Sequence, residues 1–137
     1  MSEPVDAAAL TGAWELVAFR EIDTDGRRGE GLLGPDPAGR LLYTAAGHVA
    51  VHMTRRGPAA TTAHMGYAGR WRLDGGRVVH LIEVSARPDW VGTEQIRDAS
   101  LRGDTLTLLA STAIDGVPRH RELVWRRLTG AASSSTD

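Results

Sequence analysis

The stretch from Tyr67 to Arg97, YAGRWRLDGGRVVHLIEVSARPDWVGTEQIR, decides the fold of this chain. Two runs of alternating apolar and polar residues flank Asp74-Gly75-Gly76, which is the pattern of a β-hairpin. A two- or four-residue turn would place Trp71 beside His80, whereas a three-residue turn would flip one strand relative to the other. We prefer the even-numbered turn. Its inner face gathers Tyr67, Trp71, Leu73, Val78, His80, Ile82 and Val84, and its outer face carries Arg70, Arg72 and Glu83.

The same alternation continues on both sides of this hairpin and predicts eight short strands. We expect them over residues 13–20, 40–44, 48–54, 67–73, 77–85, 93–102, 105–111 and 119–128. No helical pattern is long enough for a parallel crossover, so the strands should form an antiparallel meander. An eight-stranded antiparallel sheet closes most naturally into an up-and-down barrel, because closure removes exposed edges. The expected fold is therefore an all-β, eight-stranded, antiparallel up-and-down β-barrel.

Turn residues set the inner faces of the neighbouring strands. Ala45-Ala46-Gly47 fits a three-residue loop closed by a left-handed glycine, and Gly103-Asp104 fits a two-residue turn. The first register turns Leu41, Tyr43, Val49, Val51 and Met53 inward and leaves His48 and His52 outside. The second carries Gln95 and Arg97 inward together with Ala99, Leu101, Leu106, Leu108 and Ala110. Asp115-Gly116 should turn into the last strand.

Two connections differ from these short turns. The segment Gly34-Pro35-Asp36-Pro37-Ala38-Gly39 predicts a rigid loop that cannot lie inside a central strand. The segment from Arg55 to Met65 is rich in Pro, Ala and Thr and lacks alternation. We expect it to be a longer connection near one mouth of the barrel, either a mobile surface loop or a lid.

Composition limits the class of protein. The 137 residues suffice for one domain with a real core, which we place at residues 1–128, followed by a disordered tail at 129–137. A net charge of −1 gives no reason to expect a nucleic-acid partner. The absence of cysteine excludes disulfides and thiolate chemistry. We see no signal peptide and no apolar run of membrane-spanning length, so we expect a cytoplasmic protein without a membrane partner.

The chain resembles the bacterial lipocalin-like domain family of small single-domain barrels. The resemblance rests on motifs that follow one another in order along nearly the whole domain: residues 10–16 (LTGAWEL), 34–35 (GP), 39–44 (GRLLYT), 67–71 (YAGRW), 79–80 (VH), 88–93 (PDWVGT) with Gln95 and Arg97, and 123–127 (LVWRR). It implies that Trp14 closes the barrel floor and that Arg127 or Arg126 covers it by a cation–π contact. Similar barrels in bacterial natural-product pathways act as cyclases or isomerases on hydrophobic intermediates. The resemblance therefore favours an enzyme.

The candidate catalytic residues are His80, Arg97 and Tyr43. His80 is either a satisfied core residue or an acid, base or hydrogen-bond donor toward a ligand. A buried Arg97 needs a partner, which is either a ligand oxygen or an unrecognised protein group. Tyr43 either donates a hydrogen bond or fills space. The candidate ligand-binding residues are Met53, Tyr67, Trp71, Ile82, Trp90, Gln95 and Leu108, with Trp90 as a rim residue or a packing anchor.

Metal and cofactor sites are poorly supported by the sequence. His48 and His52 would lie roughly 13 Å apart on one strand, too far to share an ion. His64 and His120 have no partner motif, and no phosphate loop, dinucleotide fingerprint or nucleophile elbow is present. A haem-binding barrel with one interior histidine is left open. We expect no metal and no cofactor.

Three functions remain open after these exclusions. The leading hypothesis is a cofactor-independent cyclase or isomerase of specialised metabolism. It would bind a small polyene- or polyketide-like substrate and act by orientation and carbonyl polarisation. The alternative is a non-catalytic carrier for a small hydrophobic ligand, and a third is a filled barrel that serves as an interaction module. The pocket should open beside residues 55–65, and a homodimer is left open.

Overall fold

The computed structural model describes residues 5–31, 33–56, 64–114 and 117–129. The expected turn at Asp115-Gly116, most of the connection at 55–65 and the tail after 129 lie outside these residues. The described elements are α1 (Ala7–Leu10), β1 (Gly12–Ile22), β2 (Arg28–Glu30), β3 (Pro37–Tyr43), β4 (His48–Arg55), β5 (His64–Asp74), β6 (Arg77–Ser85), the 3₁₀ helix η2 (Pro88–Trp90), β7 (Glu94–Arg102), β8 (Thr105–Ile114) and β9 (Val117–Arg127).

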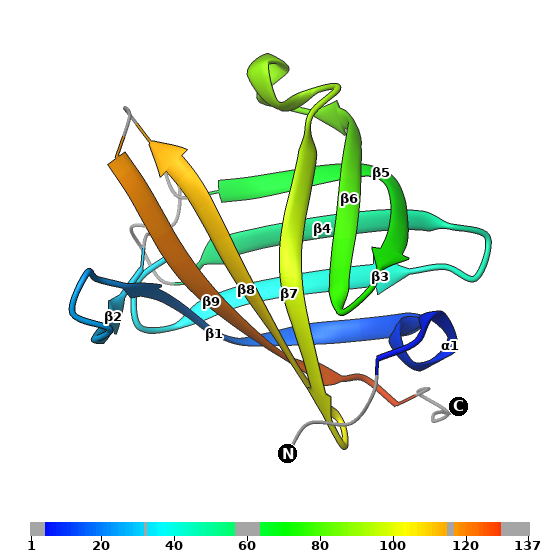
Figure 1. Ribbon diagram of the computed structural model, residues 1–137, viewed down its shortest axis with the longest axis horizontal. Helices are drawn as coiled ribbons and strands as arrows, with labels where there is room; N and C mark the ends of the chain where they lie inside the picture. The colour runs from blue at the N-terminus through cyan, green and yellow to red at the C-terminus, as the bar shows by residue number, and fades with distance from the viewer. Residues whose placement is uncertain (1–4, 32, 57–63, 115–116, 130–137) are drawn as a thin grey trace.

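The strands form a closed antiparallel barrel. Each of β3 to β9 pairs with its neighbour in sequence, β1 pairs with β3, and the pairing of β1 with β9 closes the ring. Short β2 is added to the edge of β1 and takes no part in the closure. In Figure 1 the strands β3 to β5 cross behind β6 to β9 at a steep angle. The predicted eight-stranded up-and-down barrel is confirmed.

The loop expected between β1 and β3 is shorter than predicted. Residues Arg28–Glu30 form β2, and β3 begins at Pro37, so Ala38 and Gly39 belong to a strand. Proline is tolerated as the first residue of a strand because its missing N–H removes no bond from the middle of the ladder. The prediction of a loop as far as Gly39 was therefore wrong at its C-terminal end.

The central hairpin has the even-numbered turn. Asp74 pairs with Arg77, which leaves Gly75 and Gly76 as the two turn residues, and Trp71 pairs with His80 as predicted. Gly75 has a φ of +66°, a conformation that glycine adopts at little cost. The register places His80 on the inner face, where it is 1% exposed.

A β-bulge near the end of this hairpin reverses the expected orientation of one residue. Gly69 pairs with Ile82 and Ala68 pairs with Val84, so Glu83 is an extra residue in β6. Val84 consequently lies on the outer surface, 67% exposed, and its prediction as an inner residue was wrong. A Cβ atom at Gly69 would lie 1.8 Å from the carbonyl oxygen of Leu81, so the bulge requires glycine there.

The neighbouring hairpins follow the predicted registers. Tyr43 pairs with Val49 across a loop that ends at Gly47, whose φ is +95°. The predicted inner residues of β3 and β4 are buried, namely Leu41, Tyr43, Val49, Val51 and Met53. Arg102 pairs with Thr105 around Gly103-Asp104, and Leu101, Leu106, Leu108 and Ala110 are buried.

One end of the barrel is packed by Trp14, which is fully buried. The guanidinium carbon of Arg127 lies 4.3 Å from the centre of the Trp14 ring, as the resemblance implied. Arg127 also donates to the carbonyl oxygens of Thr11 and Ala9, and the Trp14 indole donates to Leu10. These contacts hold α1 against this end of the barrel (Figure 1).

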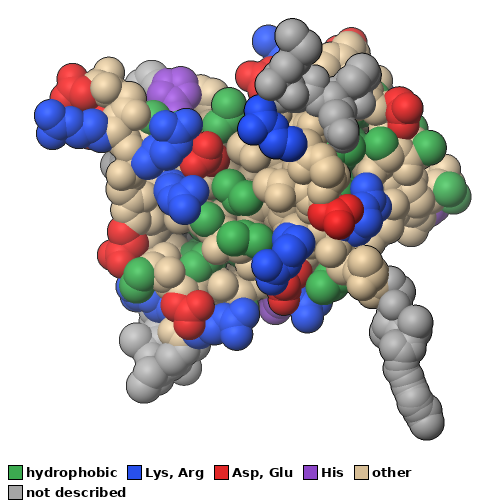
Figure 2. Space-filling view, turned by 90° about the horizontal axis from the view of Figure 1, so that it is seen from below, with side chains coloured by type: hydrophobic (Ala, Val, Ile, Leu, Met, Phe, Trp, Pro, Cys, Tyr) green, Lys and Arg blue, Asp and Glu red, His purple; other side chains and the backbone are tan. Residues whose placement is uncertain are grey.

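The outer surface carries charges of both signs. Figure 2 shows Arg and Asp or Glu side chains interspersed over one face, without a continuous basic area. Several are paired across strands; Glu122, for example, accepts from Arg20 at 3.2 Å and from Arg28 at 3.0 Å. In the described part of the chain, no helix is both long and apolar enough to cross a membrane.

Candidate functional site

The inner face of the barrel holds a hydrogen-bonded chain of three aromatic side chains. The hydroxyl of Tyr43 lies 2.7 Å from Nε2 of His80, and the hydroxyl of Tyr67 lies 2.6 Å from Nδ1 of the same ring. We refer to Tyr43, His80 and Tyr67 as the Tyr–His–Tyr chain. Both ring nitrogens are therefore occupied by hydroxyl groups of the protein itself.

Barrel closure brings these three residues together from different strands. His80 lies on β6 and Tyr67 on the adjacent β5, but the two residues are offset along this hairpin, since His80 pairs with Trp71 and Tyr67 pairs with Ser85. Tyr43 lies on β3, which is separated from β6 by two strands. Its hydroxyl reaches His80 across the interior, which only a strongly curved sheet permits.

Burial shifts the proton affinities of all three groups. Desolvation, helped by the positive charge of Arg97, lowers the pKa of His80 from 6.5 to about 3. Desolvation raises the pKa of Tyr43 well above its usual value, with a further contribution from Tyr67 and an opposing one from Arg97. It also raises the pKa of Tyr67, again opposed by Arg97. At neutral pH all three side chains of the Tyr–His–Tyr chain are therefore uncharged.

Arg97 is the cationic group of this site. It is half-buried on β7, and its Nη1 donates to Oε1 of Gln95 at 3.3 Å. Gln95 and Arg97 pair with His80 and Val78 of β6, so both lie beside the His80 strand. The neutral amide of Gln95 leaves the charge of Arg97 uncompensated at this contact, which suits a ligand carbonyl or enolate oxygen.

Three of the predicted apolar residues, Met53, Trp71 and Leu108, belong with Tyr43 to the buried apolar core. Met53, Trp71, Ile82 and Leu108 are all buried. The Trp71 ring packs against Tyr43 with a centroid distance of 4.5 Å, and its indole N–H is used by the carbonyl of Thr44. Trp71 therefore presents only apolar surface to its neighbours in the interior.

Trp90 lies at the edge of this group. The side chain is half-buried and meets Tyr67 edge to face, with ring centroids 6.3 Å apart. The guanidinium of Arg87 covers its ring at 4.7 Å. Of the two roles considered from the sequence, contact with Tyr67 and partial exposure favour a rim residue.

The three candidate catalytic residues thus lie near enough for the charge of Arg97 to act on His80 and Tyr43. They differ in how deeply they are buried. His80 and Tyr43 contact each other and are almost fully buried, whereas Tyr67, Gln95 and Arg97 are half-buried. Tyr67 was predicted only as a ligand-binding residue, and its polar role was missed. The sequence did offer a signal for it: the register turned Tyr67 inward, and a buried tyrosine hydroxyl normally finds a hydrogen-bond partner.

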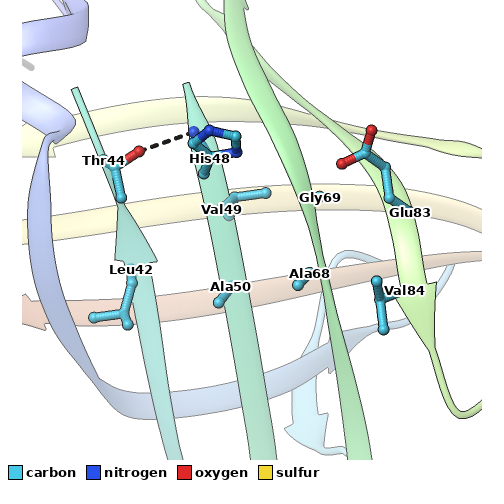
Figure 3. A pocket seen from close by; sticks show the side chains of 9 residues that line it. All are labelled: Leu42, Thr44, His48, Val49, Ala50, Ala68, Gly69, Glu83 and Val84. Atoms are coloured by element: carbon cyan, nitrogen blue, oxygen red, sulfur yellow. Dashed lines mark hydrogen bonds between the residues drawn. The ribbon is translucent and has the colours of Figure 1, made fainter. Parts of the chain in front are cut away.

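Two hollows in the described surface lie outside the barrel and are lined by none of the predicted site residues. The first hollow, of about 320 Å³, lies on the outer face of strands β3 to β6. Leu42, Ala50, Ala68 and Val84 are consecutive partners across these strands and form its apolar row (Figure 3). The second, of about 330 Å³, lies along β1 and β2 and the start of β3.

Histidines on the outer face form a pair that the sequence did not indicate. Nε2 of His64 lies 3.1 Å from Nδ1 of His52 on the adjacent strand. Within the described ranges, no group of three or more His, Cys, Asp or Glu side chains is arranged to hold a metal ion. The two imidazole rings bond to each other, and among the described residues they do not form part of a metal-binding group.

Part of this chain is similar to a known carrier protein. The 4'-hydroxy-3'-methoxypropiophenone carrier protein ppsC of Aspergillus oryzae (strain ATCC 42149 / RIB 40) is 39% identical over 54 residues. These residues are 38% of this chain and 49% of that protein, so the match spans about half the length of the relative.

Two solved structures are also similar. A single-site mutant of the fluorescent protein UnaG is 12% identical, with a TM-score of 0.42, over 90% of this chain and 99% of that chain. The siderocalin Ex-FABP is 12% identical, with a TM-score of 0.41, over 87% of this chain and 70% of that chain. Residues 11–65 and 59–128 match the lipocalin-like domain family. The chain therefore belongs to the lipocalin-like domain family.

Proposed function

We propose that the barrel binds a small hydrophobic ligand that carries a hydrogen-bonding oxygen, and that the protein acts as a carrier for it. The observation that carries this proposal is the neutral Tyr–His–Tyr chain beside Arg97 within an apolar interior. Small-molecule sites combine a mostly apolar lining with a few polar groups that fix orientation. Here Met53, Trp71 and Leu108 supply the apolar part.

The partial relative supports the class of ligand. Its name describes the carriage of 4'-hydroxy-3'-methoxypropiophenone, an aromatic ketone with one carbonyl and one phenol oxygen. Such a molecule offers a flat apolar body for Trp71 and Trp90 and an acceptor oxygen for Tyr67 or Arg97. A polyketide-like compound of similar size would use the same groups. Both belong to the class of small hydrophobic ligands expected from the sequence.

A second candidate is the cofactor-independent cyclase or isomerase. The hydrogen-bonded hydroxyl–imidazole–hydroxyl arrangement favours it, because such a chain can rearrange its protons as charge develops on a bound carbonyl. Arg97 would add a positive charge near the same oxygen. Catalysis of this kind depends on orientation and electrostatic stabilisation and needs no nucleophile.

The binding proposal is tested by isothermal titration of the purified protein with 4'-hydroxy-3'-methoxypropiophenone. A matched pair of variants locates the site. Ala99→Phe places a ring on the inner face, two residues from Arg97, and Ile96→Phe places the same ring on the exposed outer face. We expect Ala99→Phe to weaken binding at least about tenfold and Ile96→Phe to leave it unchanged. Equal effects of the two variants would exclude an interior site.

Turnover separates the two candidates. The same ketone and polyene or polyketide-like compounds are incubated with the protein, and products are followed by mass spectrometry. An enzyme should lose turnover in Arg97→Gln and His80→Gln while it keeps most of its binding. A carrier should show no product with any compound, and the same substitutions should weaken binding instead.

A further inference from the structure

We propose that the Tyr–His–Tyr chain has one fixed proton order, which leaves the Tyr67 hydroxyl as a proton donor for a ligand carbonyl. In this order Tyr43 donates to Nε2 of His80, and the Nδ1–H of His80 donates to the oxygen of Tyr67. The hydroxyl proton of Tyr67 is then directed away from His80. The inference rests on the proposed interior binding site and names its ligand class: neutral compounds with a ketone or similar acceptor oxygen.

The first step is the charge of the ring. A neutral imidazole has one N–H donor and one acceptor nitrogen, whereas the protonated ring has two donors. The buried environment keeps His80 neutral at any pH near 7. One tyrosine must therefore donate to the ring, and the other must accept from it.

The second step compares the two orders. Tyr43 is 2% exposed, and within the described chain its hydroxyl contacts only His80. If Tyr43 accepted from Nε2–H, its own proton would be buried without an acceptor, which costs about 1–3 kcal/mol. Tyr67 is the less buried of the two residues and lies against the half-buried Trp90, so we assign its proton to solvent or a ligand. The order in which Tyr43 donates is the one that leaves no buried donor unpaired.

The third step concerns the strength and selectivity of the free donor. A hydroxyl that accepts a hydrogen bond becomes a stronger donor, because successive bonds in a chain polarise one another. Arg97 acts on Tyr67 in the same direction, since its charge favours loss of the hydroxyl proton. Its positive charge also disfavours a cationic ligand. The site should therefore prefer a neutral or anionic oxygen over an amine.

The ligand arm of the test uses two compounds that differ only at the carbonyl. These are 4'-hydroxy-3'-methoxypropiophenone and 2-methoxy-4-propylphenol, in which a CH₂ group replaces the ketone. We expect wild-type protein to bind the ketone about tenfold more tightly, and Tyr67→Phe to remove this preference while it keeps affinity for the propylphenol. Equal binding of both compounds by the wild type would overturn the proton-donor assignment but not the binding site. Binding of neither would overturn the proposed function itself.

The second arm needs no ligand to report the tautomer. The two ring nitrogens of His80 are observed by ¹⁵N NMR of the free wild-type protein at pH 7, and its signals are assigned by their loss in His80→Gln. The proposal requires protonated Nδ1 and unprotonated Nε2. The opposite tautomer, or a protonated ring, would contradict it. In Tyr43→Phe the Nε2 partner is gone, so the ring should no longer be confined to one tautomer.

Discussion

The hydroxyl of Tyr67 lies 2.6 Å from Nδ1 of His80, on a ring whose Nε2 lies 2.7 Å from the hydroxyl of Tyr43. His80 is thus a bridge between two hydroxyl groups and has no free nitrogen for a ligand. This changes how its candidate role must be understood, because any effect on a ligand has to pass through Tyr67. Arg97 and Gln95, which are hydrogen-bonded to each other, are the other half-buried polar groups of this site.

The pH dependence of stability should report the buried, neutral state of His80. Its pKa falls from 6.5 in the unfolded chain to about 3 in the fold, mainly by desolvation. The unfolded state therefore binds more protons between these two values. The free energy of unfolding should fall by up to about 1.4 kcal/mol for each pH unit below 6.5 and should not change with this group above pH 6.5.

This is measured by urea denaturation between pH 7.5 and 4.5 for the wild type and His80→Gln. The difference in pH slope isolates the histidine, since the other titrating groups are common to both proteins. Parallel curves would show that His80 titrates normally in the fold.

The bond between Tyr43 and His80 should appear as a coupling energy. His80→Leu leaves the Tyr43 hydroxyl buried without its partner, which should lower the free energy of unfolding by about 1–3 kcal/mol beyond the loss of packing. In the background of Tyr43→Phe the same change should cost less. A double-mutant cycle by urea denaturation gives the coupling directly, and a value near zero would argue against the bond.

Much of this fold could be predicted from the alternation of apolar residues and from turn composition. The even turn at Gly75-Gly76 fixed the inner position of His80, and it holds in the structure. Val84 was misplaced because a bulge breaks the period of two. Gly69 is the residue that allows this bulge, yet an isolated glycine in a strand does not say which partner residue is extra.

The candidate site was harder to predict than the fold. Alternation gives the face on which a side chain lies, so Tyr43, Tyr67 and Arg97 could all be placed inside. It gives no distances across the interior, and Tyr43 reaches His80 only because β3 and β6 face each other in a closed barrel. Register alone therefore placed these side chains on the inner face but did not give their hydrogen bonds.

The planar guanidinium of Arg127 should stabilise the fold through its contact with Trp14, beyond what its positive charge contributes. Arg127 covers the ring at 4.3 Å and donates to backbone carbonyls at the end of α1. Arg127→Lys keeps the charge but loses the planar guanidinium, and it should lower the free energy of unfolding by about 1–2 kcal/mol. The matched control is Arg126→Lys, whose side chain is exposed and pairs with Glu15. We expect a change within about 0.5 kcal/mol there.

The bulge provides the sharpest test of the barrel geometry. In Gly69→Ala the new Cβ atom would lie 1.8 Å from the carbonyl oxygen of Leu81 and 2.9 Å from its carbonyl carbon. Because backbone rather than a flexible side chain is in the way, β5 and β6 must separate locally. We expect a loss of about 3 kcal/mol or more in the free energy of unfolding, or failure to fold.

Gly76→Ala is the matched control for this substitution. Gly76 lies in the turn of the same hairpin, where nothing lies within 4 Å of an added Cβ and φ is not positive. Its stability should stay within about 0.5 kcal/mol of the wild type. Thermal and urea denaturation of both variants compare them under identical conditions. If Gly69→Ala were tolerated as well as Gly76→Ala, the bulge could not lie between Ile82 and Val84, and the outward position of Val84 would need another cause.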